Sequence, residues 1–349
     1  MSSEAEPTTP PPEHGGDLAT ATARFGRPAE GWLDLSTGIS PHPYPLPEPS
    51  AAAWHRLPEP DGLEAIAARY YAAPEPLPVP GSQAAIGLLP ALWPASRVAI
   101  PEPEYAEHAA AWRRWGHRVE RIAPQRLAAG PDADTPWEVL VLSHPNNPTG
   151  ARYSLATLRA WRDHLASRGG CLIVDEAFAD AEPAASLAPE AGGAGLIVLR
   201  SLGKFFGLAG ARVGFVLAAP PIRERLAAVL GPWPLAGPAR QAAAGALADT
   251  PWQQAHRARL EQARAALAEA LSEAGLPPSG GTALFQWVPC SAPRALQEAL
   301  AHHGIWIRAF DDPPGVRLGL PGAPTDWQRL DRGLRALGRA TGHATRRRI

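Results

Sequence analysis

Cysteine is scarce in this 349-residue chain, which holds only Cys171 and Cys290. Two cysteines cannot build a disulfide framework, and their spacing does not fit a zinc site, so we expect no metal. No apolar run approaches the roughly 18 residues of a membrane span. Residues 1–13 contain Pro, Ser, Thr and Glu without an apolar core, so we expect a disordered leader rather than a signal peptide. These absences favour a cytoplasmic protein.

A strong charge of either sign is also missing. The formal net charge is −1, with 19% charged and 45% hydrophobic residues. Such a balance creates no field that would favour nucleic acid or a membrane surface. The chain also exceeds the roughly 250–300 residues at which single cores split, so we expect one larger and one smaller domain.

Short apolar segments alternate with helical patterns through the middle of the chain. Near-continuous apolar strands joined by helices are typical of a mostly parallel sheet covered on both faces, with ligands at the carboxyl ends of its strands. The expected strands are 97–100, 139–142, 172–174, 196–199 and 213–217, and the expected helices include 106–115 and 155–167. The sequence therefore predicts an α/β fold.

The pattern changes after about Pro220. A long helical region over 239–274 is followed by short strand-like segments at 283–288, 305–308 and 316–318. This arrangement indicates a smaller α+β domain. We expect a large domain over 45–235 and a small domain formed by 14–44 and 236–349.

A lysine among glycines and small residues follows one of the expected strands. Lys204 has Ser201 three residues before it and Arg212 eight residues after it. The serine and arginine indicate that an anion binds beside the lysine. An amine next to a phosphate subsite suits pyridoxal phosphate, because the amine takes the aldehyde while the other donors hold the phosphate.

The stretch from Gly203 to Phe215, GKFFGLAGARVGF, resembles the lysine segment of fold-type-I pyridoxal-phosphate enzymes, the aspartate aminotransferase superfamily. It is most similar to the threonine-phosphate decarboxylases of cobalamin biosynthesis and to histidinol-phosphate aminotransferases. The resemblance runs from His14 to about Arg317, because further motifs recur in order. It implies the fold-type-I architecture, pyridoxal 5'-phosphate as cofactor, Lys204 as its attachment point and a homodimer.

Two polar residues after expected strands resemble groups that hold the cofactor ring. Asn147 lies in the NNPTG segment, which on its own predicts a turn, and resembles the family's donor to the phenolic oxygen. Asp175 follows a buried strand, 28 residues after Asn147 and 29 before Lys204. It resembles the carboxylate that keeps the ring nitrogen protonated and the ring an electron sink.

The phosphate and the outer ring face are assigned to residues earlier in the chain. Ser82 and Gln83 open a helical stretch whose free amides would join Ser201 and Arg212 around a phosphate. Tyr105 resembles the aromatic residue that stacks on the cofactor ring.

Two positions depart from the aminotransferase pattern. Phe178 stands where a tyrosine often binds the phenolic oxygen, which leaves Asn147 as the expected donor. Leu57 stands where a tyrosine often reaches the neighbouring subunit's cofactor phosphate, so that contact is not expected here.

Further substrate-binding residues are expected near both ends of the chain. Arg317 resembles the arginine that binds the substrate α-carboxylate, and Arg308 a second substrate arginine of the decarboxylases. His14-Gly15-Gly16 and the segment STGISP, which contains Gly38, resemble their amino-terminal segments that fold over the substrate. The expected substrate-binding residues are His14, Gly15, Gly38, Asn147, Arg308 and Arg317. Two arginines and a glycine-rich flap suit a small molecule with both a carboxylate and a phosphate.

The resemblance implies decarboxylation of L-threonine O-3-phosphate to (R)-1-aminopropan-2-ol O-2-phosphate. A histidinol-phosphate-type aminotransferase remains the first alternative, because substrate orientation rather than cofactor chemistry separates the two reactions. The amino-terminal His-Gly-Gly and STGISP segments favour the decarboxylase. A non-catalytic partner or regulatory protein is the second alternative, and the presence of Lys204, Asp175 and Arg212 argues against it.

Overall fold

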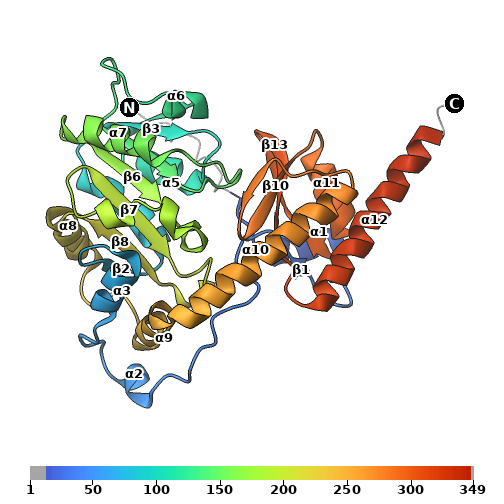
Figure 1. The fold of residues 1–349 in the computed structure, drawn as a ribbon, viewed down its shortest axis with the longest axis horizontal. Helices are drawn as coiled ribbons and strands as arrows, with labels where there is room; N and C mark the ends of the chain where they lie inside the picture. Colours follow the sequence, from blue (N-terminus) through green and yellow to red (C-terminus); the bar gives the residue numbers. More distant parts are fainter. Residues whose placement is uncertain (1–12, 347–349) are drawn as a thin grey trace, which may run out of the picture.

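The computed structural model describes residues 13–346 and, of these, the side chains up to residue 337. A larger lobe built around a seven-stranded sheet lies beside a smaller lobe with two short sheets, and the long helix α10 (Thr250–Glu273) runs between them (Figure 1). No helix in the described part of the chain is long and apolar enough to cross a membrane.

The large sheet has the strand order β2-β8-β7-β6-β5-β3-β4. Its strands are β2 (Leu77–Val79), β3 (Arg97–Pro101), β4 (Arg118–Ile122), β5 (Val139–Ser143), β6 (Cys171–Asp175), β7 (Leu196–Ser201) and β8 (Gly214–Ala218). Strands β3 to β7 pair in parallel, whereas β8 is antiparallel to β7 and β2 is antiparallel to β8. The predicted α/β fold with a mostly parallel sheet is therefore confirmed.

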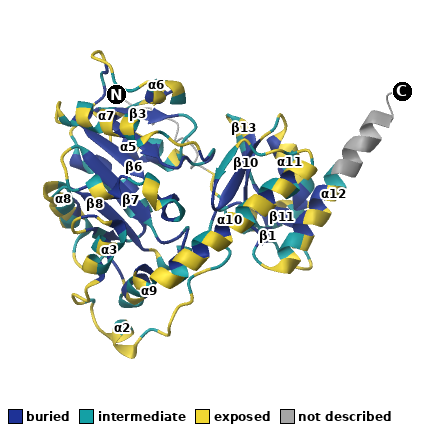
Figure 2. Ribbon diagram, in the orientation of Figure 1, coloured by how far each residue is buried: buried dark blue, intermediate teal, exposed yellow. Residues whose placement is uncertain are grey.

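Central strands of this sheet are buried on both faces. In β6, Leu172 and Val174 join one apolar cluster, while Cys171 and Ile173 join the cluster on the opposite face. Successive side chains of a strand point to opposite faces, so a continuous apolar run fits only a sheet with helices on both sides. Figure 2 shows these strands as buried and the outer turns of the helices as exposed.

The larger lobe also contains α-helices on both sides of this sheet and at its edge. They are α2 (Ala51–His55), α3 (Leu63–Tyr71), α4 (Ser82–Leu88), α5 (Ala106–Arg114), α6 (Pro124–Ala128), α7 (Leu155–Ala166), α8 (Pro220–Leu230) and α9 (Gly237–Ala248). Helix α7 begins where the sequence provides a cap, because the Ser154 hydroxyl accepts a hydrogen bond from the Thr157 amide at 3.0 Å.

The smaller lobe combines both ends of the chain. Strand β1 (Leu33–Asp34) pairs in parallel with β11 (Ile305–Trp306). A four-stranded antiparallel sheet has the order β12-β13-β10-β9. Its strands are β9 (Gly280–Thr282), β10 (Phe285–Pro289), β12 (Arg308–Asp311) and β13 (Pro314–Gly319), and the lobe's other helices are α1 (Leu18–Phe25), α11 (Pro293–Ala301) and α12 (Pro324–Arg346).

Two chain segments link the lobes. One follows β1 and runs past the Lys204 turn, where the Ser40 amide donates to the Lys204 carbonyl at 3.0 Å. The other passes from α9, which lies against α3 of the larger lobe, into α10. The expected domain boundaries at 44/45 and 235/236 stay a prediction.

Candidate active site

A cavity of about 230 Å³ opens where β5, β6 and β7 end. The structure brings all the expected site residues to its wall except Gly38 and Arg308. The expected residues that line it are His14, Gly15, Ser82, Gln83, Tyr105, Asn147, Asp175, Ser201, Lys204, Arg212 and Arg317. Residues from positions 14 to 317 thus converge on one hollow at the carboxyl edge of the sheet, as is typical of ligand sites in open α/β folds.

Lys204 lies in the turn after β7, and it is the only lysine of the chain. Burial and then the positive charge of Arg317 lower the pKa of its amine to about 8, while the charge of Asp175 opposes the shift. The amine stands 5.3 Å from the centre of the Phe178 ring. A lysine desolvated beside other cations has more neutral, nucleophilic amine near neutral pH than a surface lysine has.

Asp175 ends β6, and its side chain is 6% exposed. One carboxylate oxygen accepts the Ala177 amide at 3.0 Å, and the other lies 3.2 Å from His108 Nε2. Burial opposes protonation of His108, but the hydrogen bond to Asp175 and the charges of Asp175 and Glu104 raise its pKa. His108 and the Ala177 amide therefore fix the orientation of the Asp175 carboxyl group, which can face a cation in the cavity.

Several hydrogen-bond donors that could bind an anion line the cavity together with Lys204. Arg212 adopts a left-handed conformation (φ 51°), and its Nη1 donates to the Ala209 carbonyl at 3.1 Å. A Cβ at Gly81 would lie 2.7 Å from Arg212 Nη2, so only glycine lets the arginine approach the start of α4 at Ser82. Ser201 lines the same part of the cavity, so the arrangement can hold a phosphate.

Arg317 enters the cavity from β13. Its Nη1 donates to Asn147 Oδ1 at 2.5 Å and its Nη2 to the Ser36 carbonyl at 2.6 Å. Its buried Nε has no hydrogen-bond partner among the described residues, and no carboxylate there pairs with it. Burial and then the charge of Arg308 lower its pKa to about 10. A buried guanidinium without an anionic partner can accept the carboxylate of a ligand.

Gly38 and Arg308 lie beside the cavity rather than on its wall. Gly38 has a φ of 64°, and a Cβ there would meet the rings of Phe285 at 3.2 Å and Phe178 at 3.3 Å. Arg308 Nη2 donates to the Glu13 carbonyl at 2.5 Å and its Nη1 to the His14 carbonyl at 3.3 Å. Both residues therefore contact chain segments that border the site.

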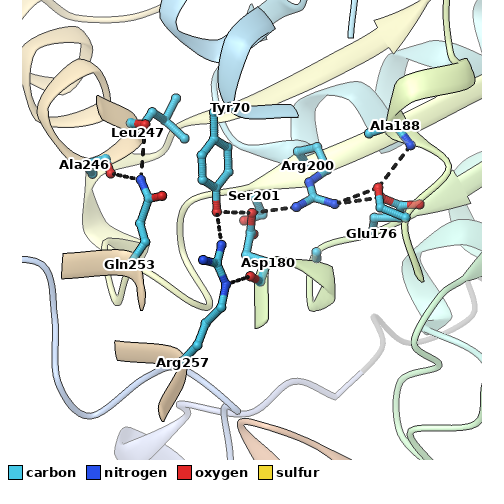
Figure 3. A network of polar contacts seen from close by, with 12 residues as sticks. Tyr70, Glu176, Asp180, Ala188, Arg200, Ser201, Ala246, Leu247, Gln253 and Arg257 are labelled. Carbon is cyan, nitrogen blue, oxygen red and sulfur yellow. Dashed lines mark hydrogen bonds and ion pairs between the residues drawn. The ribbon is translucent and has the colours of Figure 1, made fainter. Parts of the chain in front are cut away.

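A buried polar network underlies the strand ends (Figure 3). Arg200, the residue before Ser201, donates to Glu176 at 2.6 Å and to Asp180 at 2.5 Å. Tyr70 also donates to Asp180 at 3.1 Å, and Arg257 of α10 donates to the Asp180 carbonyl at 2.9 Å. Burial opposes the charge of Arg200, but the two carboxylates raise its pKa. The network ties the turns that carry Asp175 and Ser201 to α10.

Sequence reasoning missed three groups around the cavity: His108 behind Asp175, Glu107 beside Gln83, and the network around Arg200. The helical spacing of His108 three residues after Tyr105 could have indicated that both face the sheet. No comparable sequence signal indicates the buried ion pairs of Arg200, because this residue simply follows an expected apolar strand. The sequence also offered a stronger argument for Lys204, because no other lysine exists to compete for its role.

The family model for "Aminotransferase class I and II" matches residues 53–337. A threonine-phosphate decarboxylase of Pseudomonas aeruginosa is 49% identical over 92% of this chain and 97% of its own length. Another, from Sinorhizobium sp., is 44% identical over 91% of this chain and 96% of its own length. The crystal structure of histidinol-phosphate aminotransferase from Sinorhizobium meliloti in complex with pyridoxal-5'-phosphate is similar at a TM-score of 0.77 and 19% identity, covering 93% of this chain and 95% of that one.

Proposed function

This chain belongs to the class I and II aminotransferase family, and we propose that it is a pyridoxal-phosphate-dependent decarboxylase of L-threonine O-3-phosphate. The observation that carries the proposal is the 49% identity, over nearly the full length of both chains, to a threonine-phosphate decarboxylase. The likeness to the aminotransferase structure, at 19% identity, extends to the fold alone. The product would be (R)-1-aminopropan-2-ol O-2-phosphate, as cobalamin biosynthesis requires.

The residues of the cavity fit pyridoxal phosphate. Lys204 supplies the single side-chain amine, Asp175 a buried carboxylate for the ring nitrogen, and Tyr105 an aromatic face. Ser82, Gln83, Ser201 and Arg212 would hold the phosphate, and Gly81 leaves the space that Arg212 needs there. Asn147 accepts from Arg317 through Oδ1, which leaves its Nδ2 to donate to the phenolic oxygen.

The bound cofactor supplies an electron sink for whichever bond at the substrate Cα stands perpendicular to its ring. The chain's own residues decide which bond that is. Arg317 would bind the α-carboxylate, since its Nε is buried without a partner among the described residues. His14, Gly15, Gly38 and Arg308 would enclose the phosphate end of the substrate.

In decarboxylation the bond from Cα to the carboxylate breaks, carbon dioxide leaves, and a proton replaces it at Cα. Lys204 Nζ can hold and release that proton, because its pKa of about 8 is close to neutral. The ring centre of Phe178 lies 5.3 Å from the amine, and this side chain has no hydroxyl that could act as an acid beside Lys204. The protein must therefore hold both ends of the substrate, so that the bond from Cα to the carboxylate is the one that stands perpendicular to the cofactor ring.

We also infer a cytoplasmic homodimer with two domains, 45–235 and 14–44 together with 236–349. Trp54 and Leu57 flank the end of α2 with 66% and 62% of their surfaces exposed, and Leu46 precedes the helix at 53%. Such exposed apolar side chains on one projecting segment suit burial against a second copy. Phosphorylated small molecules are the expected partners, and neither nucleic acid nor a membrane is expected.

The test is incubation of the holoenzyme with L-threonine O-3-phosphate, measuring carbon dioxide and the amine product. We expect both in equal amounts without any 2-oxo acid, and no turnover by Lys204→Ala. Histidinol phosphate with 2-oxoglutarate gives the counter-test. Steady glutamate formation, with no carbon dioxide from threonine phosphate, would replace the decarboxylase with the aminotransferase and leave the cofactor site assignments standing.

A further inference from the structure

The chain segment 13–17 is fixed to the smaller lobe through its backbone. Arg308 of β12 donates to the carbonyls of Glu13 and His14, and the Gly16 amide donates to the Ser36 hydroxyl at 2.8 Å. A Cβ at Gly15 would lie 2.3 Å from the Ser36 carbonyl oxygen, so the segment lies directly on the chain that follows β1. The backbone around His14 is therefore held against the smaller lobe.

The His14 side chain, in contrast to its backbone, contacts the larger lobe. Its Nε2 lies 2.9 Å from a carboxylate oxygen of Glu107, in the first turn of α5 in the larger lobe. The imidazole is 47% exposed, whereas the Glu107 side chain is only 13% exposed. His14 also lies 6.0 Å from the Tyr105 ring, between centroids. One hydrogen bond thus links the segment over the cavity to the lobe that carries Lys204.

Glu107 is shared between His14 and the inner wall of the cavity. Its second oxygen accepts from Gln83 Nε2 at 3.1 Å, and Gln83 Oε1 accepts from the Tyr105 hydroxyl at 3.0 Å. His14, Gln83 and Tyr105 line the cavity, but Glu107 does not. A half-buried carboxylate therefore stands behind three wall residues and fixes the positions of two of them directly.

We propose that Glu107 is a positioning residue that holds His14 over the cavity, so that the amino-terminal segment presents its imidazole to the anionic end of a phosphorylated substrate. The inference rests on the proposed function for the identity of that substrate. With Nε2 donating to Glu107, Nδ1 is the ring nitrogen left for a ligand, and it has no hydrogen bond among the described residues. Nδ1 donates to an anion in the form of the ring that carries a proton on both nitrogens. The imidazole is then oriented before the substrate binds.

The surroundings of Glu107 support positioning rather than a contribution to folding. A hydrogen bond that a carboxylate accepts from a half-exposed side chain adds little to the stability of the fold. Holding a side chain of a glycine-rich segment in one rotamer instead removes an ordering cost that the substrate would otherwise meet on binding. Loss of Glu107 should therefore weaken substrate binding far more than it weakens the fold.

Carbethoxylation of histidine by diethyl pyrocarbonate tests the contact without using activity. Trypsin releases His14 as the one histidine of the peptide that ends at Arg24, and His164 as the one histidine of residues 163–168. In the Glu107→Ala holoenzyme we expect His14 to react at least threefold faster than in the wild type, with His164 unchanged. Glu64→Ala is the matched control, since Glu64 lies in the first turn of α3, pairs with Arg240 and is outside the cavity. It should leave the His14 rate unaltered.

Kinetics then test the purpose of the contact. Glu107→Ala and His14→Ala should each raise KM for threonine phosphate about tenfold with kcat within twofold, and the double variant should be no worse than His14→Ala. His14→Ala is the safeguard against misfolding, because its side chain is half exposed. An unchanged His14 rate in Glu107→Ala, or additive effects on KM, overturns the inference. If the wild-type enzyme releases no carbon dioxide from threonine phosphate, KM is measured for the same single and double variants with histidinol phosphate. Failure of the proposed function and failure of this inference therefore remain distinct.

Discussion

Lys204 carries the only side-chain amine of this chain, and its surroundings determine how that amine titrates. Burial is the largest influence and disfavours the charged form, and the nearby Arg317 cation acts in the same direction. Asp175 acts in the opposite direction without cancelling them. The resulting pKa of about 8 lies well below the ordinary lysine value of roughly 10.4.

The titration of Lys204 can be measured directly in the cofactor-free protein. The reaction rate of an amine reagent with the peptide 201–212, plotted against pH, should have its midpoint near 8. Arg317→Met should move the midpoint upward, because removing a positive neighbour favours the ammonium form. Arg335→Met, at an exposed ion pair with Asp331, should not move it. A wild-type midpoint near 10 would contradict the assigned environment.

Individual site residues were predictable from the sequence where they stand in ordered motifs, as Lys204, Asp175 and Asn147 do. Glu107 and His108 were not, because a glutamate and a histidine early in a helix look the same whether they face solvent or a cavity. Their roles depend on His14 and Asp175, which lie 93 and 67 residues away. Contacts at that separation arise from the tertiary fold and leave no local pattern.

At the scale of elements, the five central strands were predictable because each is an uninterrupted apolar run buried on both faces. Strand β4 was missed, since three of the five residues of this edge strand are charged (Arg118, Glu120 and Arg121) and the strand is largely exposed. Strand β2 spans only Leu77–Val79 and includes a proline, so its pattern is too short to recognise. The sequence predicted where β6 and β7 end, but it did not predict the ion pairs of Arg200 with Glu176 and Asp180 next to those ends.

The Arg200 network predicts a large stability effect at those strand ends. Arg200→Ala would leave Glu176 and Asp180 buried without their cation, since all three side chains are at most 3% exposed. Breaking a buried ion pair in this way costs about 3–5 kcal/mol. Urea unfolding should therefore show a loss of that size with an unchanged slope, whereas Arg335→Ala should cost at most about 1 kcal/mol. A loss below about 1 kcal/mol for Arg200→Ala would mean that water or rearrangement compensates the two carboxylates.

On the scale of the whole molecule, the cavity belongs to neither lobe alone. Lys204, Asp175 and Arg212 come from the larger lobe, and His14 and Arg317 from the smaller. The segment that passes the Lys204 turn continues into the projecting α2 region, where Trp54 is 66% exposed. The proposed α2 interface and the site are thus connected through one stretch of chain.

That connection leads to a prediction about assembly. Burying Trp54 and Leu57 against a second copy would remove two large apolar side chains from water, and a tryptophan at the centre of an interface often contributes about 2 kcal/mol or more. Trp54→Glu should therefore raise the dimer dissociation constant at least thirtyfold, measured by light scattering after size-exclusion chromatography across a dilution series.

Val229→Glu is the matched control, because Val229 is 49% exposed near the end of α8, away from α2. A wild-type protein that stays monomeric at micromolar concentration, or a dimer that Val229→Glu weakens as much as Trp54→Glu does, would place the interface elsewhere.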